Sequence, residues 1–226
     1  MLPHALHLLR QQRLAISRRP FNARGGKMQR CDRCMLREIY CICGVSHRTP
    51  CNAAVLLLMY DDEILKPSNT GRLIADVIAD TSGYIWARNE PNEELLAKIS
   101  DPQYQPFLVF PDEYAKPEQP VVHQVAVAAG KTPLFILIDG SWREARKIFS
   151  KSPYLHHLPM LSICPKTLSR YQMRVAAKEN HLATAEVAAM VLELADCPHA
   201  ADALNERFDL FKERYLAGKM SREPKF

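Results

Sequence analysis

The chain has no hydrophobic run long enough to cross a membrane. Its longest apolar stretches, 53–59 and 134–138, have the length of β-strands, whereas a membrane span needs roughly 18–20 residues. The 226 residues also contain no internal repeat, no low-complexity tract and no heptad pattern, which excludes a repeat protein and a coiled coil. We therefore expect a globular protein with one sizeable core and no membrane partner.

Acidic residues are missing from the first 30 positions, which hold seven Lys and Arg side chains. The remaining chain has 23 basic against 25 acidic residues, so the net charge of +5 comes from this N-terminal arm. A basic arm suits a polyphosphate partner such as RNA, because each neutralised phosphate releases counterions. The same composition is typical of a mitochondrial transit peptide or of a solvated tail. We favour an RNA-binding arm, with Arg18 and Arg19 as candidate contacts.

The seven cysteines do not form the pattern of a disulfide framework. Four of them, Cys31, Cys34, Cys41 and Cys43, follow the pattern C-x2-C-x6-C-x-C, and the other three are scattered. This usage predicts a reducing compartment, the cytoplasm, and one thiolate cluster. Zinc accepts four sulfur ligands in a closed tetrahedral site, so we predict a structural Zn2+ ion. An iron–sulfur cluster uses the same ligands and is an alternative, as is a site in which His47 replaces one cysteine.

From residue 53 onwards, apolar strand-like segments alternate with helical ones. The fully apolar strands favour an α/β fold, in which a mostly parallel sheet is flanked by helices on both faces. We divide the chain into a basic arm at 1–27, a zinc-binding segment at 28–50 and an α/β domain at 51–226. Strands are expected at 53–59, 83–87, 107–110, 134–138 and 160–163. Helices are expected at 4–17, 68–80, 92–99, 121–129, 141–149, 181–195 and 203–216.

The most informative segment lies where the apolar strand 134–138 meets the following helix. The strand places Asp139 at its carboxyl end, Gly140 allows a tight turn, Ser141 can cap the helix and Trp142 falls in its first turn. A turn aspartate and a core tryptophan would give the same spacing. A carboxylate beside an indole can, however, accept a proton while the indole stacks on a base. The following helix carries three basic residues that could contact RNA: Arg143, Arg146 and Lys147.

Two other strand ends carry polar groups. Asn69, Thr70 and Arg72 follow the first strand, and Phe110 and Pro111 end the third. Capping and turn chemistry explain each one singly. Because ligands bind beyond the carboxyl ends of parallel strands, together they predict one binding edge.

The segment Asp139-Gly-Ser-Trp142-Arg-Glu-Ala resembles the signature of the DTW-domain family, Asp-x-Thr/Ser-Trp-x-x-Ala. Four further matches follow the family's order: the cysteine cluster and the segments 68–73, 110–111 and 181–186. The resemblance covers roughly 28–216, and Ser141 keeps the hydroxyl where many members have Thr. The chain is most similar to the bacterial branch, the tRNA-uridine aminocarboxypropyltransferases.

This resemblance implies an enzyme that transfers the 3-amino-3-carboxypropyl group of S-adenosylmethionine to N3 of a tRNA uridine. The expected product is acp3U at position 47 of the variable loop, with release of 5′-methylthioadenosine. The family is related to the SPOUT methyltransferases, so the resemblance also implies a knotted SPOUT-like sheet. An RNA methyltransferase and a non-catalytic zinc-stabilised RNA-binding protein are the alternatives. The sequence does not fix the oligomeric state, for which we expect a monomer.

The resemblance also implies roles for the residues at the strand ends. Asp139 is the expected base or the group that orients the uracil, and Trp142 the wall of the base pocket, with Ser141 beside them. Residues expected to hold the donor are Asn69, Thr70, Arg72, Phe110, Pro111, Asp139, Gly140, Leu161 and Ile163.

Overall fold

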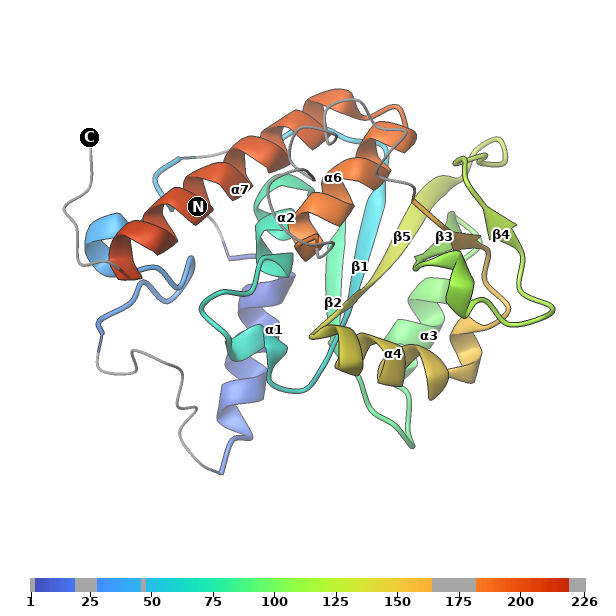
Figure 1. Ribbon diagram of the computed structural model, residues 1–226, viewed down its shortest axis with the longest axis horizontal. Helices are drawn as coiled ribbons and strands as arrows, with labels where there is room; N and C mark the ends of the chain where they lie inside the picture. Colours follow the sequence, from blue (N-terminus) through green and yellow to red (C-terminus); the bar gives the residue numbers. More distant parts are fainter. Residues whose placement is uncertain (1–2, 19–27, 46–47, 164–181, 220–226) are drawn as a thin grey trace.

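The computed structural model describes residues 3–18, 28–45, 48–163 and 182–219 (Figure 1). These residues form a six-stranded sheet in the order β2-β1-β5-β3-β6-β4, and every neighbouring pair is parallel. The predicted α/β fold with a parallel sheet is therefore confirmed. The strands are β1 (Ala54–Met59), β2 (Thr81–Ile85), β3 (Tyr104–Val109), β4 (Val121–Val122), β5 (Thr132–Asp139) and β6 (Met160–Leu161).

The neighbouring interior strands β1 and β5 are apolar because helices cover both faces of the sheet. All six residues of β1 are buried, and its register with β5 runs from Ala54 opposite Leu134 to Met59 opposite Asp139. Such strands lack the alternation of apolar and polar residues seen where one face meets water. This register brings the carboxyl ends of β1 and β5 to the same edge.

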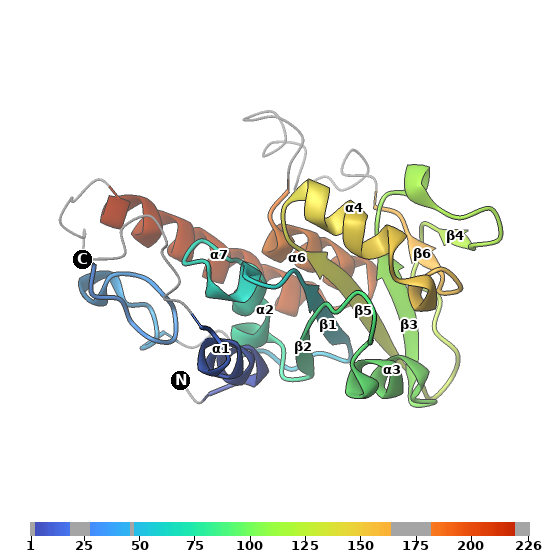
Figure 2. The same ribbon diagram turned by 90° about the horizontal axis from the view of Figure 1, so that it is seen from below.

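The helices divide between the two faces (Figures 1 and 2). Four helices pack on one face: α1 (Ala5–Ala15), α2 (Gly71–Val77), α6 (Thr184–Leu194) and α7 (Pro198–Lys219). Helices α3 (Glu93–Ser100) and α4 (Trp142–Ser150) pack on the other. The chain leaves β1 towards α2 and leaves the adjacent β5 towards α4. Connections that diverge from neighbouring strands open a crevice at their carboxyl ends, which is the usual ligand site of such sheets.

The helix predicted at 121–129 is wrong. Val121 and Val122 instead form the short edge strand β4 and pair with Met160 and Leu161 of β6. β-Branched side chains suit a strand, and the open edge of β6 supplies the backbone partners that the local pattern does not reveal.

Helix boundaries also shift relative to the sequence prediction. Helix α2 begins after Thr70 instead of Ser68 and ends at Val77, because the chain must turn before β2 starts. Helix α7 begins at Pro198, five residues earlier than expected, where proline is tolerated because first-turn N–H groups have no intrahelical partner. No helix within the described residues has the length and apolar character required to cross a bilayer.

The helix predicted in the basic arm is confirmed, and it packs against the α/β domain. Leu6 of α1 is 1% exposed, and a Cβ added to Gly83 of β2 would approach its side chain to 2.7 Å. At the other end of α1, Arg13 donates to both carboxylate oxygens of Asp61, at 2.7 and 2.8 Å. Much of the arm's first half is therefore a fixed part of the domain surface beside the end of β1.

Candidate active site at the carboxyl edge of the sheet

Asp139, the last residue of β5, is held between the starts of α2 and α6. Side chains alternate along the strand, so its carboxylate lies on the face covered by these helices. Oδ2 accepts a hydrogen bond from Asn69 Nδ2 at 2.8 Å, and Oδ1 accepts one from Thr184 Oγ1 at 2.6 Å. A Cβ at Gly71 would overlap Oδ2, so only glycine lets α2 approach this closely. The carboxylate is 3% exposed.

Burial and, to a smaller extent, the negative charge of Glu63 raise the pKa of Asp139 to about 6, against the hydrogen bonds from Thr184 and Asn69, which lower it. Glu63 also accepts from Asn69 Nδ2, at 3.2 Å, and pairs with Lys66 at 2.7 Å. The side-chain amide of Asn69 thus donates to the carboxylates of both Asp139 and Glu63. A carboxyl group that titrates near neutral pH is suited to accept a proton during a reaction.

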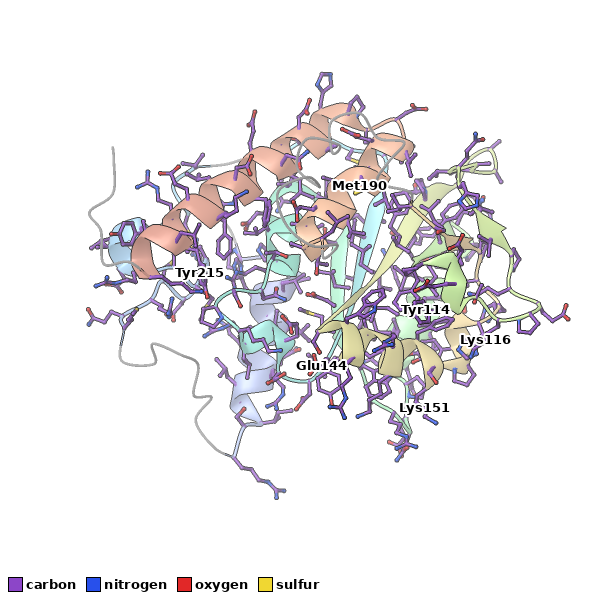
Figure 3. All side chains as sticks on the ribbon, in the orientation of Figure 1. Tyr114, Lys116, Glu144, Lys151, Met190 and Tyr215 are labelled. Atoms are coloured by element: carbon purple, nitrogen blue, oxygen red, sulfur yellow. The ribbon has the colours of Figure 1, made fainter. Side chains whose placement is uncertain are left out.

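The turn after Asp139 is fixed by a capping box. Ser141 is the N-cap of α4, and both its backbone N–H and its hydroxyl donate to Glu144 Oε2, at 2.7 and 2.6 Å. Glu144 lies at the start of α4, where Figure 3 labels it. The hydroxyl of Ser141 therefore secures the helix start that presents Trp142.

Trp142 belongs to an aromatic cluster on the opposite face from the Asp139 carboxylate. Its ring stacks on Phe110 at 5.5 Å between centroids and meets Tyr114 edge-on at 5.8 Å. The indole is 40% exposed, which leaves part of it accessible. Pro111 follows Phe110 and is the N-cap of the 3-10 helix η3 (Asp112–Tyr114). The carboxylate of Asp139 and the indole of Trp142 therefore lie at the same edge of the sheet but on its opposite faces.

Arg72 does not lie in an open position at this edge. Its guanidinium is buried and donates to the carbonyl oxygens of Lys66 and Pro67, at 3.3 and 2.6 Å. It also stands 5.4 Å from the centre of the Phe211 ring. Burial lowers the pKa of Arg72 to about 10. Arg72 therefore fixes the loop that carries Asn69.

The other predicted donor residues lie near the same edge of the sheet and are buried to different degrees. Thr70 is the N-cap of α2, and its hydroxyl accepts from Ala185 N of α6 at 3.4 Å. Leu161 is fully buried in β6, and Ile163 is half-buried on the face of α6. Gly140 lies beside Tyr60. A Cβ atom added to Gly140 would be 3.3 Å from the Cβ atom of Tyr60.

The predicted RNA contacts fall in two places. Arg143, Arg146 and Lys147 are all exposed on α4. Arg18 is exposed beyond the end of α1, and Arg19 lies outside the described residues. The predicted RNA contacts therefore lie on two different elements, helix α4 and the end of helix α1.

Sequence reasoning missed two groups of this site. Thr184 lies inside the segment 181–186, which carries part of the family resemblance. That resemblance could have identified Thr184 as a site residue. Glu63 had no local signal, because it reaches Asp139 only through Asn69.

The Sγ atoms of the four clustered cysteines lie at separations that suit a tetrahedral metal centre. The Sγ atoms of Cys31 and Cys43 are 3.6 Å apart and those of Cys34 and Cys41 are 3.9 Å apart, with all four within 4.8 Å of one another. Zn–S bonds of about 2.3 Å place tetrahedral sulfur atoms about 3.8 Å apart. The donor set therefore fits zinc and leaves no open ligand position. His47, the alternative ligand, lies outside the described residues.

We expect one zinc ion per chain in purified protein, measured by elemental analysis. Cys34→Ser should remove it, because a serine hydroxyl is a far poorer zinc ligand than a thiolate, whereas Cys51→Ser, at a cysteine outside the cluster, should retain it. Stoichiometric iron with inorganic sulfide would instead identify an iron–sulfur cluster.

The chain is similar in sequence to a known protein family and to a curated protein. The family model described as the DTW domain matches residues 28–216. A similar curated protein is tRNA-uridine aminocarboxypropyltransferase 2 of Drosophila melanogaster, 26% identical over 185 residues that cover 79% of this chain and 70% of that protein. No solved structure matches the chain significantly.

Proposed function

Because the chain belongs to the DTW domain family, we propose that it is a tRNA-uridine aminocarboxypropyltransferase. It transfers the 3-amino-3-carboxypropyl group of S-adenosylmethionine to N3 of a tRNA uridine and releases 5′-methylthioadenosine. The name of the Drosophila relative supports this activity. The observation that carries the proposal is the buried Asp139 carboxyl, with a pKa of about 6, at the carboxyl ends of β1 and β5.

The proposed reaction needs a base and an oriented donor. The N3–H bond breaks and its proton passes to the Asp139 carboxylate, while N3 forms a bond to the γ-carbon of the donor. The bond from that carbon to sulfur breaks, and its electron pair stays on sulfur, which becomes a neutral thioether. A sulfonium is already a good leaving group, so the residues mainly supply orientation and proton transfer.

We assign the donor to the crevice between the loop before α2 and the end of β3. Asn69 and Thr70 would contact its amino-acid end. Its adenosine would lie against Phe110, Pro111, Gly140 and Ile163, with Leu161 buried beneath them. Arg72 would position the Asn69 loop through its bonds to backbone carbonyls instead of binding the donor carboxylate. Trp142, partly exposed beside Phe110, would contact the target base from the other side of the sheet edge from the Asp139 carboxylate.

The proposal extends to the metal, the knot, the oligomeric state, the cellular compartment and the modified position in the tRNA. We assign the cluster of four cysteines a structural Zn2+ ion, whose closed ligand set supplies folding energy and no catalytic position. We expect a monomeric, cytoplasmic enzyme that acts on position 47 of the tRNA variable loop. The SPOUT-like knot remains a prediction, because 164–181, which joins β6 to α6, lies outside the described residues.

Mass spectrometry of unmodified tRNA incubated with the protein and S-adenosylmethionine tests the activity. We expect one uridine to gain the mass of the aminocarboxypropyl group, with 5′-methylthioadenosine as co-product. A gain equal to one methyl group would identify a methyltransferase. Unchanged tRNA that still binds the protein would favour a non-catalytic RNA-binding protein.

Glu63→Gln is expected to shift the acid limb of the pH–rate profile to lower pH. The negative charge of Glu63 raises the pKa of Asp139, and a glutamine carbonyl can still accept the bond from Asn69. Asp139 would then stay ionised at lower pH, so the midpoint should fall below its wild-type value near 6. Transfer rates measured from pH 5 to 8 give the two midpoints.

Glu93→Gln on α3 is the matched control, because Glu93 lies on the opposite face of the sheet from the carboxylate of Asp139. Its profile should coincide with that of the wild type. An unchanged or raised midpoint in Glu63→Gln would contradict the electrostatic coupling of Glu63 to Asp139.

A further inference from the structure

Two aromatic residues follow β1 and β2 at the same edge of the sheet as Asp139. Tyr60 and Trp86 come directly after the paired residues Met59 and Ile85, and their rings stack with centroids 6.2 Å apart. The backbone N–H of Tyr60 donates to the Asp139 carbonyl at 2.9 Å. This aromatic pair is therefore fixed to the end of β5, on the α4 side of the sheet, whereas the Asp139 carboxylate lies on the α2 and α6 side.

The aromatic pair is held rigidly and is only half-buried. The indole N–H of Trp86 donates to Ser152 Oγ at 2.9 Å, and its backbone N–H donates to Met59 O at 2.8 Å. Both rings keep part of their surface accessible. Rigid aromatic rings at a surface are a suitable platform for stacking a nucleobase.

Lys147 of α4 places a positive charge over both rings. Its ammonium lies 5.4 Å from the centre of the Tyr60 ring and 5.7 Å from that of Trp86. It also approaches the Tyr60 hydroxyl at 3.4 Å. Arg143 and Arg146 are exposed on the same helix. Aromatic faces next to mobile cations are the combination that binds unpaired nucleotides, through base stacking and phosphate contacts.

Helix α4 thus separates two aromatic groups. Phe110, Tyr114 and Trp142 lie towards β3, where Figure 3 labels Tyr114 beside α4. Tyr60 and Trp86 lie at the ends of β1 and β2, in contact with Lys147. A uridine that reacts at N3 must leave its stack, and the nucleotide next to it then also exposes a base face.

We propose that Tyr60, Trp86 and Lys147 form a binding site for one unpaired nucleotide of the tRNA, adjacent to the modified uridine. The base stacks on the exposed ring surface, and the Lys147 ammonium leaves the rings to bind the nucleotide's phosphate. This site rests on the proposed function, because it takes tRNA as the substrate of the neighbouring crevice. A tRNA in which this nucleotide is unpaired satisfies both contacts, whereas a regular duplex keeps its bases stacked inside.

Binding of an unmodified tRNA transcript to the full-length protein tests the site. Tyr60→Leu and Lys147→Gln should each weaken tRNA binding about tenfold, since one removes a stacking surface and the other a phosphate contact. Lys147→Gln should also reduce the slope of log affinity against log salt by about 0.7, the value for one single-strand phosphate. The affinity for S-adenosylmethionine, measured by calorimetry, should stay within twofold of wild type and confirms that both variants are folded.

Lys219→Gln is the matched control. Lys219 of α7 also stands over a tyrosine, 4.9 Å from the centre of the Tyr215 ring, but α7 covers the other face of the sheet from α4 (Figures 1 and 2). Its tRNA affinity should equal that of the wild type. The proposal is overturned if Tyr60→Leu and Lys147→Gln bind tRNA as the wild type does, or if Lys219→Gln weakens binding equally.

The same measurements separate this site from the proposed activity. Wild-type protein that binds tRNA through Tyr60 and Lys147 but transfers nothing from S-adenosylmethionine supports the site and overturns the activity. Wild-type transfer together with unimpaired tRNA binding by both variants overturns the site alone.

Discussion

Asp139→Asn is expected to lower the rate of aminocarboxypropyl transfer by about 10²- to 10⁴-fold, the usual contribution of a general base. Asparagine has nearly the same shape and can keep both contacts, since its carbonyl can accept from Asn69 and its amide can donate to Thr184. It cannot accept a proton near neutral pH. Single-turnover rates with saturating S-adenosylmethionine and tRNA measure the effect.

The same variant should not lose stability at pH 8. Burial raises the pKa of Asp139 from 3.8 to about 6, so the folded protein binds a proton between these values that the unfolded chain does not. The stability contribution of Asp139 therefore falls as pH rises from about 4 to 6, and at pH 8 the buried carboxylate costs about 1–3 kcal/mol. Asparagine removes this cost. Urea unfolding at pH 5 and pH 8 compares the two proteins.

Glu118→Gln, at an exposed carboxylate before β4, is the control and should change neither rate nor stability. Full activity in Asp139→Asn would show that Asp139 is not the base. Its role would then be to hold the starts of α2 and α6 together through Asn69 and Thr184.

Arg207→Met is expected to reduce the free energy of unfolding by about 3–5 kcal/mol, the usual cost of removing one partner from a buried ion pair. Arg207 of α7 has no exposed surface. Its Nε donates to Asp76 Oδ2 at 2.9 Å, and its Nη1 donates to the carbonyl oxygens of Ile42 and Val45, at 2.8 and 3.2 Å. Methionine fills part of the volume but removes the positive charge beside Asp76, whose Oδ1 keeps its contact with the His4 ring at 3.2 Å.

This arginine also joins the metal segment to the domain, because Ile42 lies between two of the cysteines. Arg207→Met should therefore lose zinc to a competing chelator at lower chelator concentrations than the wild type. Urea unfolding of the metal-loaded protein gives the stability change, and chelator titration gives the zinc affinity.

Two comparisons test the reason for this loss. Arg207→Met combined with Asp76→Leu should recover part of the stability, because the uncompensated carboxylate is gone. Lys212→Gln breaks an exposed ion pair with Asp209 on the same helix and should change stability by less than about 0.5 kcal/mol. A loss below about 1 kcal/mol in Arg207→Met would contradict the buried-pair explanation.

The sequence by itself determined the features that depend on local pattern. The fully apolar segments around 54–59 and 134–138 specified buried parallel strands, since such strands have no solvent face that would require polar residues. The spacing of the cysteines between Cys31 and Cys43 specified a cluster that can hold a metal, because four thiolates within thirteen residues can reach one ion. The Asp139–Trp142 motif specified the family and the sheet edge where the chemistry is proposed.

Only the tertiary structure decided which distant groups meet at that edge. Asn69 and Thr184 lie 70 and 45 residues from Asp139, and no local pattern encodes their hydrogen bonds to its carboxylate. Val121 and Val122 became an edge strand because β6 offered unpaired backbone groups to them. Burial, hydrogen bonding and pKa shifts depend on neighbours that the fold brings together, so the chemical state of Asp139 follows from the packing of α2 and α6 around it.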